Sequence, residues 1–367
     1  SGVARSINYY PIGDEQADEG IASLALGLGK YIVDGGQTLR VSPYHPHQVL
    51  QTSEMETALR ETQTQFYALD MQHVGEDFKV DDGFNILKLR VKDAEADHAL
   101  NFIASTYDPY DQVIRDGLYD GGRKIISFAG VLQQDVFPLP QLLQMTMRYG
   151  AAEMRRPIEV EFACNLNADR TGSFFLLQIR PIVDSKQMLD EDICAISDDR
   201  CLLRSHNSLG HGASEEVTDV VYVKTDDQFT AINNPAIACE IERINRRFLD
   251  EGRGYVLIGP GRWGSSDPWL GVPVKWPHIS AAQVIVEVEL KNYRVDPSQG
   301  THFFQNLTSF GVGYFTIDTN TDNGIYRKEV LDAMPAVEET QFVRHVRFDK
   351  PLKILMDGKK QEGVVLI

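Results

Sequence analysis

Hydrophobic and polar residues alternate clearly in the segment that spans residues 159–181. Residues 160–163 alternate as a strand does, residues 165–172 are rich in turn formers, and residues 173–179 form a second strand-like run. Two such runs joined by a short turn-rich loop are typical of a β-hairpin. The pattern therefore predicts two antiparallel strands at this point of the chain.

The rest of the first half is predicted to mix helices and strands. The spacing of apolar residues predicts a helix over 21–32, stopped by Gly35 and Gly36. Further helices are predicted over 54–67, 94–104 and 139–149, the last one amphipathic and packed beside the hairpin. Strands or short extended pieces are predicted over 1–8, 39–41, 48–52, 66–70, 86–91 and 124–128.

The second half is predicted to be a separate, β-rich unit. Residues 183–200 are acidic and aperiodic, which is typical of a linker or a packed connector. Beyond them, strands are predicted over 217–223, 255–258, 282–289 and 313–318, and a long amphipathic helix over 234–249. Asp357-Gly358 is a strong turn signal, so it predicts a terminal hairpin between 352–356 and 363–367.

The hairpin carries side chains that suit phosphate chemistry. Residues two apart in a strand point to the same face, so Glu159 shares a face with Glu161, and Gln178 shares one with Arg180. If these faces coincide, the oxygen ligands suit Mg²⁺ and the arginine suits a phosphate group. A salt-bridged surface hairpin would give the same pattern, because structural ion pairs imitate functional ones.

Residues 159–181 resemble the end of the ATP-binding domain of the phosphoenolpyruvate synthase and pyruvate phosphate dikinase family, which is of the ATP-grasp class. That family has an acidic-x-Glu-aromatic-Ala strand, then a hairpin to a Gln-x-Arg-Pro strand. The resemblance implies that Glu161 and Gln178 bind the metal ion and that Arg180 contacts phosphate. Glu159 matches the acidic residue before them. It implies ATP and Mg²⁺ as cofactors.

A second match lies at the start of the chain. Residues 1–4 with Ser6 and Asn8 resemble the family's S-G-V-x-F-T-x-N, and residues 25–35 resemble its G-L-G-E-x-V-V-x-G. Arg5 stands where the family usually has an aromatic residue, and Lys30 replaces a usual glutamate. The family's first half, with a phosphate-binding lysine and arginine, is not matched. Because Ser1 is not an initiator methionine, we expect a fragment or a processed product that holds half an ATP site.

His302 is a candidate phosphoryl carrier. Gly300-Thr301-His302 lies in a predicted loop before a short helix, where the helix dipole would stabilise a phosphoryl group on the ring. It resembles the G-x-T-S-H or G-R-T-C-H loop of the family's swivelling domain, although the residue between Thr301 and His302 is missing. The alternative is a histidine that caps a helix or packs under the two phenylalanines that follow it.

These observations predict a mixed α/β (α+β) fold in two parts. Residues 1–183 are predicted to be the C-terminal part of an ATP-grasp domain, with an inserted α+β subdomain at about 51–123. Residues 184–202 are predicted to be a linker, and residues 203–367 a β-rich, swivelling, phosphohistidine-like domain.

Two further motifs are weaker candidates. Residues 259–264 fit G-x-G-x-x-G after a strand, but a dinucleotide fingerprint must open a helix, and Pro268 makes one improbable here. We expect a structural turn, with an anion-binding turn at Arg262 as the alternative. His45 and His47 have a spacing that permits metal binding, but no third ligand is near in sequence, so we expect a surface loop.

Composition narrows the partners. The formal charge of −17 argues against a nucleic-acid or acidic-membrane surface. No run approaches the roughly 18 to 20 apolar residues that a membrane helix needs, and the scattered cysteines favour buried free thiols in a reducing cytoplasm. We therefore expect a cytoplasmic protein, and the resemblance implies a nucleotide as its partner. Pyruvate, phosphoenolpyruvate or another phosphoryl acceptor would bind through regions outside this chain.

Three functions remain open at this stage. The first is an ATP-dependent phosphotransferase, a kinase-like transferase related to the dikinase family, that binds Mg-ATP and relays a phosphoryl group through His302. The second is a catalytically degenerate module that regulates or binds another protein. The third is an ATP-grasp ligase, which the nearer match to the dikinase hairpin disfavours.

Overall fold

The computed structural model describes residues 1–71, 85–182, 192–225, 229–265, 267, 269–289, 307, 310–318 and 324–367. By their internal contacts the residues form two compact units. Unit 1 comprises Ser1–Asn8 and Asp18–Val183, and unit 2 comprises Tyr9–Ala17 and Asp184–Ile367. The predicted mixed α/β fold class is confirmed, since each unit combines β-sheets with helices. The predicted boundaries of the insertion, the linker and the second domain stay predictions.

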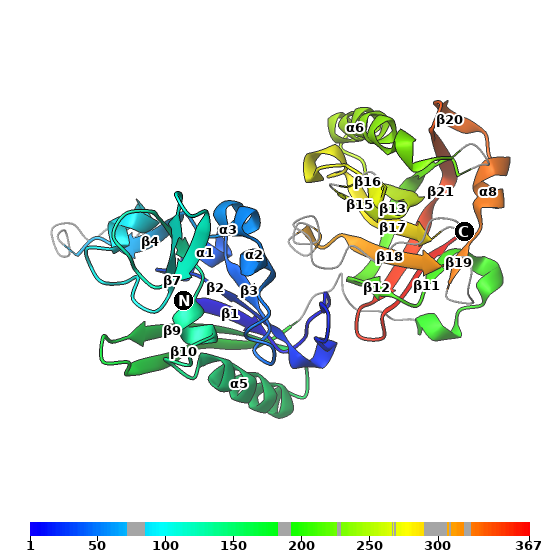
Figure 1. Ribbon diagram of the computed structural model, residues 1–367. Helices are drawn as coiled ribbons and strands as arrows, with labels where there is room; N and C mark the ends of the chain where they lie inside the picture. The colour runs from blue at the N-terminus through cyan, green and yellow to red at the C-terminus, as the bar shows by residue number, and fades with distance from the viewer. Residues whose placement is uncertain are drawn as a thin grey trace. The chain divides into compact units, whose positions relative to one another are not determined.

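Unit 1 is built on an antiparallel sheet (Figure 1). Its described strands follow the spatial order β10-β9-β1-β2-β3, and each neighbouring pair is antiparallel. The predicted hairpin is confirmed as β9 and β10, which form one edge of this sheet. The strands are β1 (Gly2–Arg5), β2 (Ile21–Leu24), β3 (Leu39–Val41), β9 (Ile158–Leu166) and β10 (Gly172–Pro181).

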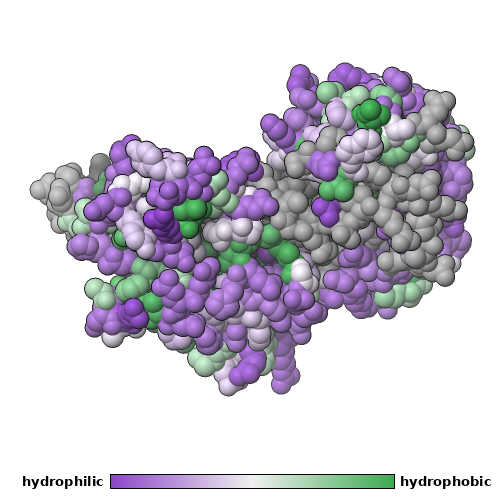
Figure 2. All heavy atoms as spheres, in the orientation of Figure 1, coloured by the Kyte–Doolittle hydropathy of each residue, from purple (hydrophilic) through white to green (hydrophobic). Residues whose placement is uncertain are grey.

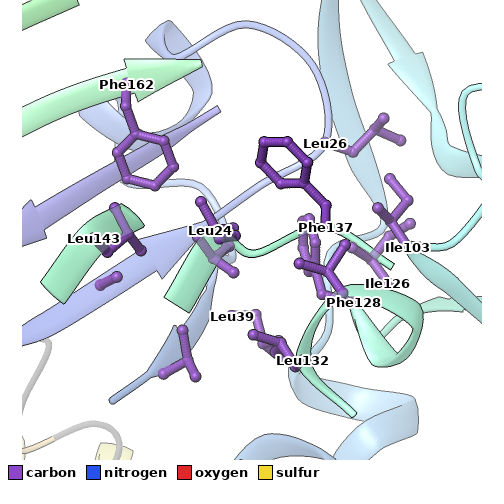
Figure 3. Close-up of a cluster of buried hydrophobic side chains, with 14 of the residues drawn as sticks. Leu24, Leu26, Leu39, Ile103, Ile126, Phe128, Leu132, Phe137, Leu143 and Phe162 are labelled. Atoms are coloured by element: carbon purple, nitrogen blue, oxygen red, sulfur yellow. The ribbon is translucent and has the colours of Figure 1, made fainter. Parts of the chain in front are cut away.

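One face of this sheet is covered by helix α5 (Leu139–Met154), which runs along the hairpin in Figure 1. The predicted amphipathic helix is thereby confirmed. Figure 3 shows Phe162 of β9, Leu24 of β2 and Leu143 of α5 pointing into one apolar cluster. Ile103, from the region 51–123 that is predicted to be an insertion, belongs to the same cluster. This region therefore contributes to the core of unit 1.

Short elements complete unit 1. Two strands form one small sheet and three form another. The predicted pairing of 66–70 with 86–91 is confirmed by the first of these sheets. The strands are β4 (Gln65–Leu69), β5 (Ile86–Arg90), β6 (Ala104–Asp108), β7 (Val113–Asp116) and β8 (Arg123–Ile126). The helices are α1 (Lys30–Val33), α2 (Leu50–Ser53), α3 (Met55–Glu61) and α4 (Ala129–Leu132), with 3-10 turns η1 (Ala17–Glu19) and η2 (Val91–Ala94).

Four predictions in this unit are wrong. Residues 21–24 of the predicted helix 21–32 form strand β2, because pairing with both β1 and β3 buries Ala22 and Leu24. The predicted helix 54–67 ends at Glu61, because residues 65–67 belong to strand β4, which pairs with β5. The predicted helix 94–104 does not form: residues 95–103 are turns, and His98 and Phe102 adopt positive φ angles that no α-helix allows. Residues 48–52, predicted as extended, contain the start of α2.

Unit 2 is built on a larger mixed sheet. Ten described strands form it, and its central strands β13, β14, β17 and β18 run parallel. The predicted terminal hairpin is confirmed as β21 and β22. The strands along the sheet are β12 (Ser208–Leu209), β18 (Gly313–Asp318), β17 (Ala282–Glu289), β14 (Tyr255–Pro260), β13 (His211–Val223), β21 (Val343–Asp357), β22 (Glu362–Leu366), β11 (Cys201–Ser205) and β19 (Ile325–Tyr326), with β20 (Ala336–Glu339) beside β21.

Helix α6 (Asn234–Asp250) connects β13 to β14 and packs on the sheet of unit 2 (Figure 1). Its apolar stripe, which includes Ile237, Ile241 and Phe248, is fully buried, so the predicted amphipathic helix is confirmed. The remaining short elements of unit 2 are α8 (Lys328–Ala333), β15 (Arg262–Trp263), β16 (Gly271–Val272), η3 (Ile193–Ala195), η4 (Asp198–Arg200), η5 (Ala231–Asn233) and η6 (Trp276–His278).

The segment Tyr9–Ala17 belongs to unit 2 although it follows β1 of unit 1. The Tyr9 ring stacks on His211 with 4.4 Å between ring centroids, and its carbonyl oxygen accepts a hydrogen bond from the Gly210 amide. The chain therefore passes between the units at residues 8–9, at 17–18 and at 183–184.

Hydrophilic residues cover most of the face of unit 1 that Figure 2 shows. This agrees with a charged content of 24%. Across the described ranges, no helix combines the length and the apolar character that a membrane crossing requires.

Candidate functional site

The predicted site residues of the hairpin, which are Glu159, Glu161, Gln178 and Arg180, lie on the face of the unit 1 sheet that points away from the core. Along β1 and β9, alternate side chains point to opposite faces. Gly2 and Ala4 pair with Phe162 and Val160 on the core face. Only glycine fits at position 2, because an added Cβ would lie 2.2 Å from the Phe162 ring. The intervening residues of both strands therefore occupy the opposite face.

One row of residues across three neighbouring strands is charged. Arg5 of β1 lies opposite Glu159 of β9, which lies opposite Arg180 of β10. Nε of Arg5 donates to Oε2 of Glu159 at 2.8 Å, and Nε of Arg180 donates to Oε1 at 3.0 Å. Nη2 of Arg180 also donates to Oε1. We call these three residues the charged row.

Exposure and charge differ sharply within the charged row. The Glu159 side chain is 9% exposed, whereas those of Arg5 and Arg180 are 54% and 56% exposed. Burial acts to raise the pKa of Glu159, but the hydrogen bonds from Arg180 and Arg5 outweigh it and hold that pKa below its usual value. The carboxylate is thus ionised beneath two guanidinium groups that reach into solvent.

A second row lies two residues further along the strands. Val3 lies opposite Glu161, and Glu161 lies opposite Gln178, with a β-bulge just before Gln178. Glu161 is half-buried and Gln178 is exposed. Neither side chain makes a hydrogen bond or ion pair to a described residue, so their oxygen atoms are available to a ligand. We call Glu161 and Gln178 the oxygen row.

The oxygen row fits Mg²⁺ by its chemistry. Mg²⁺ takes oxygen ligands and usually keeps several waters, so one carboxylate and one amide oxygen beside a phosphate chain suffice. Nowhere in the described ranges do three or more His, Cys, Asp or Glu side chains gather in a way that would hold a metal ion. The chemistry therefore favours a metal ion that arrives with a phosphate ligand over a site closed by protein side chains.

The N-terminal motif residues have structural roles around this sheet. Ser6 accepts a hydrogen bond from the Ile158 amide at 2.8 Å, which holds the register of β1 against β9. Asn8 accepts a hydrogen bond from Nη2 of Arg40 at 2.8 Å. Gly27 adopts a φ of +89°, and an added Cβ would lie 2.4 Å from the Tyr67 carbonyl oxygen, so its backbone requires glycine.

His302 and the whole loop 300–306 lie outside the described residues. The G-x-G-x-x-G segment 259–264 contains strand β15 at the point where a dinucleotide site needs the start of a helix. Trp263 in this turn is buried, and its backbone amide donates to the buried carboxylate of Glu287 at 2.9 Å. The turn is thus part of the packing of unit 2.

The other candidate ligands are dispersed. His45 pairs with Glu19 through Nε2 and Oε2 at 3.0 Å, and His47 is exposed. The four cysteines are free thiols, but Cys194 and Cys239 are exposed, so the expectation of buried thiols is wrong for these two. A cleft of about 690 Å³ lies elsewhere in unit 1, between the residues 63–65, 90–95 and 120–124, and contains none of the predicted site residues.

Arg5 and a charged cluster in unit 2 were not predicted as sites. Arg5 was recognised only as a departure from the family pattern, although it lies two residues after Val3 in a predicted strand, so alternation already put the two on one face. In unit 2, Asp219 of β13 is 1% exposed and accepts hydrogen bonds from His345, Arg347 and Arg253. These partners are far apart in the sequence, so no local pattern indicates this cluster.

Unit 1 is thus a mixed α/β structure whose hairpin presents charged and polar side chains to solvent. Residues 1–200 match the family model described as pyruvate phosphate dikinase, AMP/ATP-binding domain. The chain belongs to this family, so the resemblance inferred from the hairpin and the N-terminal motif is confirmed. The family supports ATP or AMP as the ligand. Comparison with curated proteins and with solved structures gave no match.

Proposed function

We propose that the chain binds Mg-ATP at the charged row and the oxygen row, as part of an ATP-dependent phosphotransferase of the dikinase type. The observation that carries the proposal is the strand register, which puts Glu159 opposite Arg180 and Glu161 opposite Gln178 on a solvent-facing surface. Had these side chains pointed to opposite faces, or into the core, no single ligand would reach all four of them.

Charge explains why a metal ion belongs in the proposal. Arg5 and Arg180 are balanced by Glu159 and Glu161, so the two rows together carry no net charge. A triphosphate would gain little electrostatic energy from such a surface alone. When bound, Mg²⁺ supplies two positive charges that neutralise phosphate oxygens. Glu161 and Gln178 would hold it, while Arg180 would contact the phosphate chain through its unpaired Nη1 group.

The proposed chemistry is positioning and charge neutralisation, on which phosphoryl transfer generally depends. His302 would accept the phosphoryl group in a swivelling, phosphohistidine-like second domain and pass it to an acceptor. Within this proposal, unit 1 is the C-terminal part of an ATP-grasp domain, and pyruvate or phosphoenolpyruvate would bind outside this chain.

Calorimetry of the full chain with Mg-ATP tests the binding proposal. We expect wild-type binding that is lost in Glu161→Ala, because the variant removes a metal ligand. Glu153→Ala is the matched control, since Glu153 is an exposed glutamate of α5, a helix that packs on the core face of the sheet. Heat of binding that is the same in both variants, or absent from wild type, would refute the proposal.

The carrier step is tested separately. After incubation with labelled ATP, we expect an acid-labile, base-stable label on the wild-type protein and none on His302→Ala. Label that persists in His302→Ala excludes His302 as the carrier. A wild-type protein that binds Mg-ATP but takes up no label would support the nucleotide site and refute the phosphoryl relay through His302.

A catalytically degenerate regulatory module is the second candidate, and one observation favours it. Lys30 stands where the family usually has a glutamate, and its Nζ pairs with Oδ1 of Asp34 at 3.2 Å on the same helix. The side chain is thus occupied by a local ion pair. Mg-ATP binding without any phosphoryl transfer in the complete protein would support this module over an enzyme.

A further inference from the structure

We infer that Arg5 is a second phosphate-contacting residue, which works with Arg180 as a clamp on a polyphosphate tail. The inference rests on the proposed function and adds to it a residue and a preference for ATP over AMP. It starts from the charged row, in which two arginines flank one carboxylate.

The hydrogen bonds leave donors free on both arginines. Among the residues that the structure describes, Arg5 contacts Glu159 only through Nε, and neither of its Nη groups has a hydrogen-bond partner there. Arg180 uses Nε and Nη2, so its Nη1 group remains. Guanidinium groups bind phosphate through such paired N–H donors, and hydrogen bonds to charged groups are among the strong ones in proteins.

Glu159 orients the clamp. Its carboxylate is almost fully buried and binds one arginine at each oxygen, so the two guanidinium groups are held on either side of a fixed point. After this pairing the row still carries one positive charge. A phosphate group that lies above Glu159 would meet donors from both arginines, with no further side chain to be ordered.

The distance between the rows points to a chain of phosphates. The charged row and the oxygen row are two residues apart, which is about 6.6–6.8 Å along a strand. AMP offers only one phosphate group, which would have to serve both an Mg²⁺ ion at Glu161 and the clamp beside Glu159. A triphosphate spans that distance, so the arrangement favours ATP over AMP.

The test compares Mg-ATP with AMP by calorimetry on the full chain and its Arg5→Gln variant. We expect Arg5→Gln to weaken Mg-ATP binding about 10- to 100-fold, as loss of a charge-assisted contact does, and to change AMP binding less than about twofold. Arg5→Lys keeps the charge but not the paired donors, so we expect partial recovery. Arg156→Gln, which removes an exposed arginine after α5, is the matched control and should bind as wild type.

The outcomes separate this inference from the proposed function. A wild type that does not bind Mg-ATP overturns both. If Glu161→Ala abolishes binding while Arg5→Gln binds Mg-ATP within about twofold of wild type, the nucleotide site stands and the clamp is refuted. Equal weakening of Mg-ATP and AMP, together with a lower unfolding temperature, would show that Arg5 only supports the sheet and would also refute the clamp.

Discussion

Replacement of Asp219 by asparagine is a demanding test of the charge network in unit 2. The Asp219 carboxylate is 1% exposed and accepts four hydrogen bonds. On Oδ1 the donors are Nε2 of His345 at 2.7 Å and Nε of Arg347 at 2.8 Å. On Oδ2 they are Nη1 of Arg253 at 2.6 Å and the Thr218 hydroxyl at 2.7 Å. Asparagine keeps one of these oxygens and places an N–H₂ group against the other two donors.

His345 cannot compensate for this loss. Its ring is fully buried, and Nη2 of Arg247 lies 3.0 Å from Nδ1. Because arginine only donates, Nδ1 accepts and Nε2 carries the proton given to Asp219. The ring is thus held in one tautomer, in which Nε2 can only donate. If the amide N–H₂ group of the variant faces Nε2, the Nε2–H group has no acceptor.

We expect Asp219→Asn to lower the free energy of unfolding of unit 2 by about 3–5 kcal/mol, the range for removal of one partner from a buried ion pair. With a urea slope of about 2 kcal/mol/M, the midpoint should fall by about 1.5–2.5 M. Tryptophan fluorescence reports this unit alone, because the three tryptophans of the chain are Trp263, Trp269 and Trp276. Asp349→Asn, at an exposed position of the same strand as His345, should change stability by less than about 0.5 kcal/mol.

The pH dependence supplies a second criterion. Burial acts to raise the pKa of Asp219, but the hydrogen bonds from His345 and Arg347 hold that pKa well below its usual range. A carboxyl whose pKa is lower in the folded state stabilises it above its unfolded pKa of about 3.9 and loses that contribution as the pH falls. The difference in the free energy of unfolding between wild type and Asp219→Asn should therefore become smaller below about pH 4. If this difference is unchanged from pH 7 to about pH 2.5, or if the urea midpoint shifts by less than about 0.5 M, the reasoning is refuted.

Three further predictions follow from packing and titration. Leu143→Ala, on the buried side of α5, should destabilise unit 1 by about 2–5 kcal/mol, seen as faster hydrogen exchange in β9 than in wild type; equal exchange would contradict the assigned core. Gly259→Ala places a Cβ 2.3 Å from the Trp263 ring, so it should lower the free energy of unfolding by about 1–3 kcal/mol and shift the tryptophan emission. An unchanged emission spectrum would contradict this contact. Burial raises the pKa of the Cys164 thiol to about 11, so at pH 8 this thiol should react with a disulfide reagent far more slowly than exposed Cys194. The reaction rate of Cys164 should keep rising toward pH 11. Equal rates for the two thiols at pH 8, followed by mass spectrometry, would contradict this.

Local patterns in the sequence determined several parts of the structure. The alternation in the hairpin and the turn between its runs predicted β9 and β10, and side-chain alternation alone put Glu159 and Glu161 on one face. Helices α5 and α6 were predicted by their amphipathic spacing, which persists over 16 and 17 residues. These features depend on neighbours a few residues away, so the sequence suffices to predict them.

Other features were decided by contacts between distant segments. Residues 21–24 became a strand because β1 and β3 pair with them on both sides, against a local spacing that favours a helix. Arg5 joins Glu159 across 154 positions, and Asp219 meets His345 across 126 positions. Such rows and networks exist only once strands from separate parts of the chain lie in register, because a hydrogen bond requires atoms within about 3 Å of each other. The hairpin of the proposed nucleotide site was therefore predictable from sequence, whereas the second arginine beside it was decided by the tertiary structure.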